Sequence, residues 1–163
     1  MTATNVLRSA LVGAAAGAAG TTALNTATYL DMVLRARPAS STPEKTVEKL
    51  AELAGTSVPG ADEERANRLA GLAALSGIAT GVTVGLLYGA ARGLGFRLPL
   101  ATGSAAAATA ALLASNGPMT ALGITDPRTW GAVDWVSDVV PHLAYGLVTA
   151  ATAAAAAAGD DGS

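Results

Sequence analysis

The chain of 163 residues contains no cysteine, which excludes disulfides, zinc–thiolate sites, iron–sulfur clusters and thiol catalysis. Charge is also scarce, because Asp, Glu, Lys and Arg make up only 13% of the residues, roughly half the share of a typical soluble domain. The formal net charge of -2 gives no basic footprint, so we expect no nucleic-acid partner. A single histidine and the lack of a nucleophile motif or phosphate-cradling loop argue against an enzyme, and we expect neither cofactor nor metal.

Hydrophobic residues make up 51% of the chain and gather in long runs. A helix needs about 20 mostly apolar residues to cross a hydrocarbon layer ~30 Å thick. Four stretches meet this requirement, at residues 7–30, 69–94, 98–122 and 133–157. The sequence therefore predicts an all-α integral membrane bundle of four transmembrane helices, forming one domain over residues 1–158, with a disordered tail at 159–163.

An alternative stays open for the first stretch. Residues 1–20 combine one basic residue with a short apolar segment and Ala-rich positions, which is typical of a cleavable signal peptide. Against this reading, the apolar stretch continues through Leu24 to Leu34, which is too long for a signal core and long enough to span. We expect a span here, and whether residues 1–20 are cleaved remains open.

Glycine recurs at four-residue intervals in two of the expected spans. Small residues at this spacing let helix backbones approach closely in lipid, where hydrophobic attraction between helices is weak. A bias toward Ala and Gly would explain the number of glycines but not their register. The pattern predicts helix packing, and more packing surface than one small bundle needs, at Gly13, Gly17, Gly77, Gly81, Gly85, Gly89 and Gly93.

Residues 31–68 form the one long polar loop. Ser41 and Pro43 are typical of a helix start, and Gly55 is typical of a helix end. Apolar residues recur on one face of the intervening segment and charged residues cover the others, so we expect a short amphipathic helix on the cytoplasmic membrane surface.

Basic residues predict the orientation. Seven lie in the 31–68 loop or at Arg128, whereas three lie on the other side, at Arg8, Arg92 and Arg97. The positive-inside rule then places both termini on the non-cytoplasmic side of the cell membrane.

Three ionisable residues recur at four-residue spacing in the fourth span, namely Asp134, Asp138 and His142. They share one helix face, and ionisable groups within a span often mark ion or proton paths. Asp138, one turn from His142, favours the charged imidazole near neutral pH. The three extend over ~12 Å along the helix, too far to converge on one metal ion without ligands from other helices.

A polar cluster is expected around His142. Counted from the expected span ends, four residues lie about 9–12 Å inside the same interface. These are Asn25, Asn116, Ser76 and His142, to which Tyr145 adds a hydroxyl. The simpler alternative is that these groups only hydrogen-bond across helices and fix their rotation, with roughly 0.6 kcal/mol per pair.

One segment carries a family resemblance. The pattern consists of Pro118, Leu122-Gly123, Thr125, Pro127, Trp130, Ser137-Asp138 and His142. It resembles the C-terminal part of the YagU-like inner-membrane proteins, which usually have glutamate at the position of Asp138 and glycine at that of Pro141. The resemblance implies a multi-span inner-membrane protein with a link to acid tolerance.

Two functional hypotheses follow. The first is a proton- or ion-responsive pore or transport unit built around Asp138 and His142. The alternative is a non-catalytic scaffold or accessory subunit of a larger membrane complex. Both require the lipid bilayer, and both are compatible with a homo-oligomer.

Overall fold

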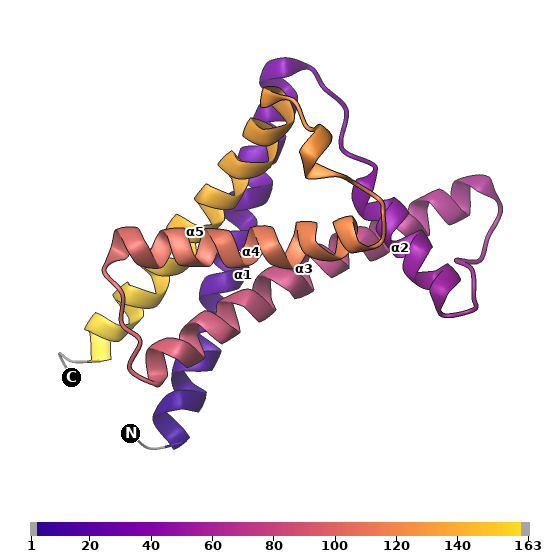
Figure 1. The fold of residues 1–163 in the computed structure, drawn as a ribbon. Coiled ribbons are helices and arrows are strands. Elements are labelled where there is room, and N and C mark those ends of the chain that lie inside the picture. The colour runs from indigo at the N-terminus through magenta and orange to yellow at the C-terminus, as the bar shows by residue number, and fades with distance from the viewer. Residues whose placement is uncertain (1–2, 161–163) are drawn as a thin grey trace.

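The computed structural model describes residues 3–160, with side chains through residue 158, and this part of the chain is helical without strands (Figure 1). Its elements are α1 (Ala3–Arg35), α2 (Thr42–Leu53), α3 (Asp62–Gly93), α4 (Leu100–Ala121), the short 3-10 helix η1 (Pro127–Thr129) and α5 (Ala132–Asp160). The predicted all-α class is confirmed. α5 extends two residues into the tail expected at 159–163, and the rest of that tail lies outside the described residues.

Two of the described helices are long and apolar enough to cross a membrane, Asp62–Gly93 and Ala132–Ala158. Within the chain, only 28% and 39% of their most apolar windows are buried. The core helix of a soluble protein would be mostly buried, whereas most of these two windows lies at the surface of the described chain.

The helices cross rather than run in parallel. α1 packs against α3 and α5, and α4 packs mainly against α5. In Figure 1, the start of α1, the α3–α4 connection and the end of α5 lie together at the lower left, and the other connections lie at the opposite ends of the helices. The interior is therefore a set of pairwise crossings with α1 and α5 at the centre.

The crossing of α1 and α3 is a backbone-to-backbone contact. A Cβ atom added at Gly13 would lie 2.6 Å from Gly89 Cα, and one added at Gly85 would lie 2.5 Å from Gly17 Cα. Real Cβ atoms do not approach other atoms so closely, so only glycine fits. Gly81 and Gly93 extend the same contact toward Thr21 and Val6.

Gly77 is an exception to the predicted packing. A Cβ atom there would meet nothing within 4 Å, because the contact of α3 with α1 begins only one turn later, at Gly81. Conversely, the sequence reading missed Gly20 and Gly146. A Cβ atom added at Gly20 would lie 2.9 Å from Tyr145 Cδ2, so Gly20 lets α1 approach α5. One added at Gly146 would lie 2.7 Å from Ala108 Cβ, so Gly146 lets α5 approach α4.

Side-chain size is distributed in an unusual way between interior and surface. Most buried hydrophobic residues are alanines, including Ala16 and Ala107, whereas leucines such as Leu11, Leu87 and Leu113 are more than half exposed. Water would favour burial of the larger side chains. The arrangement instead fits close helix packing through small residues with an apolar outer surface.

α2 begins after Ser41 and ends before Gly55, whose φ of +71° closes the helix. The Ser41 hydroxyl makes no capping bond, and the Thr42 amide donates instead to Ser40 Oγ at 3.2 Å. α2 packs along the first half of α3, where Glu48 and Arg65 form an ion pair.

Replacing Gly85 by alanine should force α1 and α3 apart, at a cost of about 1–3 kcal/mol for an overpacked contact. Gly77→Ala is the matched control on the same helix, and it should be neutral or stabilise by about 0.5–1 kcal/mol, since alanine favours a helix interior. Thermal unfolding in detergent, followed by circular dichroism, measures both. Equal melting temperatures for the two variants would contradict the packing role of Gly85.

Candidate functional site

α5 carries a column of polar side chains that reaches three other helices. We call it the α5 polar seam, and its members are Ser137, Asp138, His142, Tyr145 and Thr149. From Asp138 onward they are spaced by four, three and four residues, which keeps them on one side of the helix. Together they tie α5 to α1, α3 and α4.

His142 is nearly buried, with 8% of its surface exposed. Its Nδ1 lies 2.7 Å from the Asp138 backbone carbonyl, and its Nε2 lies 3.2 Å from Ser115 Oγ on α4. Ser115 in turn donates its hydroxyl proton to the Ala111 carbonyl at 2.9 Å. Both ring nitrogens thus lie close to hydrogen-bond acceptors. An imidazole ring protonated on both nitrogens can donate one hydrogen bond to each of these acceptors.

The Asp138 carboxylate lies between α4 and α5. Its Oδ2 accepts a hydrogen bond of 2.7 Å from Asn116 Nδ2, and its Oδ1 lies 3.6 Å from His142 Nδ1. One carboxylate, one imidazole and two neutral polar groups therefore form a compact unit, which we call the His142 cluster (Ser115, Asn116, Asp138 and His142). Ser115 was missed in the sequence, although it directly precedes Asn116.

Three of the expected members lie elsewhere. Ser76 bonds to the Ala73 carbonyl of its own helix at 2.8 Å, on the half of α3 that diverges from the others. Asn25 is half-buried on α1 and makes no hydrogen bond with the described residues. Asp134 accepts the Gly131 amide at 3.0 Å and so caps the start of α5, one turn before the His142 cluster.

Tyr145 was expected to add its hydroxyl to the polar cluster around His142, but the hydroxyl bonds to α3 instead. The residue is 1% exposed, and its hydroxyl donates to the Gly81 carbonyl of α3 at 2.7 Å. The ring packs with Val84, Ala107 and Ala111 in the central core. Tyr145 therefore holds α5 against the α1–α3 crossing and does not contact the His142 cluster through its hydroxyl.

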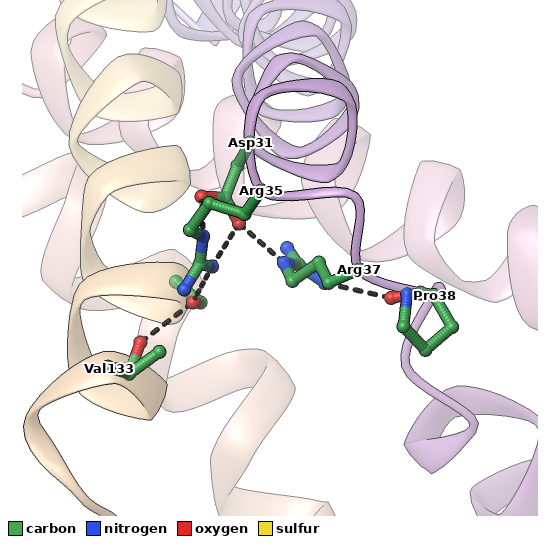
Figure 2. A network of polar contacts seen from close by, with 6 residues as sticks. Asp31, Arg35, Arg37, Pro38 and Val133 are labelled. Carbon is green, nitrogen blue, oxygen red and sulfur yellow. Dashed lines mark hydrogen bonds and ion pairs between the residues drawn. The ribbon is translucent and has the colours of Figure 1, made fainter.

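An ionic network joins α1 to α5 one residue before Asp138 (Figure 2). Arg35 bonds to Asp31 on its own helix and to the Ser137 hydroxyl of α5, which donates to the Val133 carbonyl at 2.7 Å. Arg37 adds a second bond to Asp31, at 2.5 Å. Ser137 and Asp138 are adjacent, so the ionic network and the His142 cluster meet on one turn of α5.

The network perturbs the carboxyl group that it encloses. Hydrogen bonding from Arg35, reinforced by Arg37, lowers the pKa of Asp31 from its usual 3.8 to about 2, against an opposing effect of burial. The same pairing raises the pKa of Arg35. Asp31 therefore stays ionised down to strongly acidic pH.

No group of three His, Asp or Glu side chains comes together as metal ligands within the part of the chain that the structure describes. Comparisons with protein-family models, with curated proteins and with solved structures give no match to this chain. The YagU-like resemblance thus stays a prediction, and the functional argument depends on the geometry of the seam.

Because the Asp31 pKa is depressed on folding, the ionic network should stabilise the α1–α5 contact above about pH 4 and lose this effect as the pH falls toward 2. Fluorescence of Trp130 and Trp135, next to this end of α5, should report an acid transition in that range. Asp31→Asn should remove the transition, and Asp62→Asn, which removes an exposed carboxylate of α3, should retain it. A transition unchanged in Asp31→Asn would rule out this origin.

Proposed function

We propose that this protein is a multi-pass membrane protein of the cell membrane, with α1, α3, α4 and α5 as its four spans and α2 on the cytoplasmic surface. Two helices with the length and composition of membrane spans support the proposal. So do the alanine-rich interior and the exposed leucines, since lipid, unlike water, does not penalise an apolar surface. The excess of basic residues on the side of α2 favours non-cytoplasmic termini.

Within this framework, we propose that the protein is a proton-responsive pore or transport unit centred on Asp138 and His142. The observation that carries the proposal is the double acceptor environment of a nearly buried imidazole, formed by the Asp138 carbonyl and Ser115 Oγ. Ionisable groups are costly inside a span and are usually functional there.

The cluster provides a simple proton-dependent change. When His142 is charged, Nε2 donates to Ser115, and the serine hydroxyl donates to Ala111. When His142 loses the Nε2 proton, this nitrogen becomes an acceptor, so the serine hydroxyl has to rotate toward it and leave the Ala111 carbonyl. The proton therefore alters the α4–α5 contact, which is a two-state element that pH can bias.

Reconstituted protein should give a pH-dependent proton or cation flux in liposomes, read with an internal pH dye or ion-selective electrodes. His142→Ala should abolish the pH dependence, and Asn116→Ala should shift it by removing the amide donor of Asp138. Asn25→Ala is the matched control, because Asn25 makes no hydrogen bond with the described residues. A flux identical in wild type and His142→Ala would end the proposal.

A second candidate is a non-catalytic scaffold or accessory subunit of a larger membrane complex, favoured by the exposed apolar outer face of α3. Leu72, Leu75 and Ile78 are all substantially exposed there. Native mass spectrometry of the complex extracted in mild detergent distinguishes the candidates. A stoichiometric second protein supports the accessory role, whereas a homogeneous homo-oligomer supports a self-contained unit.

A further inference from the structure

A cavity of about 270 Å³ lies at the end of the molecule where α1 begins and α5 ends. It opens between the first turns of α1, the last turn of α3 and the last turns of α5. Three arginines line it, Arg8, Arg92 and Arg97, together with the neutral side chains of Asn5 and Ser9. No Asp or Glu is among the described residues that line it.

The arginines at the opposite ends of the helices are in a different situation. Each of these five pairs with a carboxylate: Arg35 and Arg37 with Asp31, Arg65 with Glu48, Arg68 with Glu64, and Arg128 with Asp126. Arg92 and Arg97 form no ion pair with the described residues, and Arg92 instead lies 5.9 Å from the centre of the Tyr88 ring. Arg92 and Arg97 thus bring to the cavity two guanidinium groups that form no ion pair with the described residues.

Helix packing brings these groups together. A Cβ atom at Gly93 would lie 2.9 Å from Val6 Cα, so the end of α3 is held against the first turns of α1. Gly95, with a φ of +100°, then turns the chain so that Arg97 follows beside the helix end. Ala153 and Ala157 of α5 form a wall of small side chains that leaves the volume open.

We propose that this cavity, the arginine cavity, binds a phosphate-bearing anion. The planar guanidinium fork matches two phosphate oxygens at once, and Asn5 and Ser9 supply neutral hydrogen-bonding groups beside it. The phosphate comes either from a phospholipid headgroup or from a soluble phosphate compound. The site is independent of proton flux at His142, from which it is separated along α5 by the Tyr145 and Thr149 contacts.

The test uses the full-length protein in a non-ionic detergent. Native mass spectrometry measures retention of phosphatidylglycerol and phosphatidylcholine, with and without excess inorganic phosphate. The variant R92Q/R97Q removes the two arginines that form no ion pair with the described residues. R97Q alone changes only the connection that follows α3, so it repeats the test without altering that helix. K45Q/K49Q is the matched control, because it removes the same charge from α2.

Wild type should retain phosphatidylglycerol about tenfold more strongly than phosphatidylcholine. R92Q/R97Q should lose this preference for phosphatidylglycerol, and the control K45Q/K49Q should keep it. Preference that survives excess phosphate identifies a lipid headgroup, and displacement by phosphate identifies a soluble anion. If size-exclusion chromatography shows that R92Q/R97Q is misfolded, R97Q is measured instead, and its preference for phosphatidylglycerol should be reduced. Equal retention by wild type and the arginine variants, or no anion bound by wild type, would overturn the proposal.

Discussion

The close approach of the α1 and α3 backbones is the constraint on which the other contacts depend. Gly13 and Gly17 meet Gly85 and Gly89 without intervening side chains, so the two helix axes are closer than larger residues would permit. That proximity puts the Gly81 carbonyl within reach of the Tyr145 hydroxyl. It also brings the end of α3 to the start of α1, where the arginine cavity forms.

α5 is joined to this crossing mainly through polar groups. In a bundle whose interior is mostly alanine, dispersion contacts specify rotation weakly, because one small side chain resembles another. The α5 polar seam supplies directional contacts instead, with Thr149 bonding to α1, Tyr145 to α3 and the His142 cluster to α4. Position along the seam therefore separates the contacts: Tyr145 and Thr149 join α5 to α3 and α1, and the His142 cluster joins it to α4.

The arginines at the two ends of the molecule differ in whether they form ion pairs with carboxylates of the described chain. Near the start of α5, arginines are neutralised by carboxylates of this chain, and the Asp31 pair also lowers the pKa of that carboxyl. Near its end, Arg92 and Arg97 line a cavity and form no ion pair with the described residues. Guanidinium groups in this situation are suited to an external anion. The two proposals thus concern opposite ends of one helix and fail or hold separately.

Local periodicity and turn chemistry were enough to predict the helices, the limits of α2 and the glycine register. They also predicted that Asp138 lies beside His142, since both lie on one face of one helix. The partners of these residues on other helices depend on how the helices cross. The crossing geometry leaves Gly77 without a close neighbour and Ser76 bonded within its own helix, and it selects Ser115 and Asn116 rather than Asn25. Equal depth along four helices does not bring side chains together when those helices diverge.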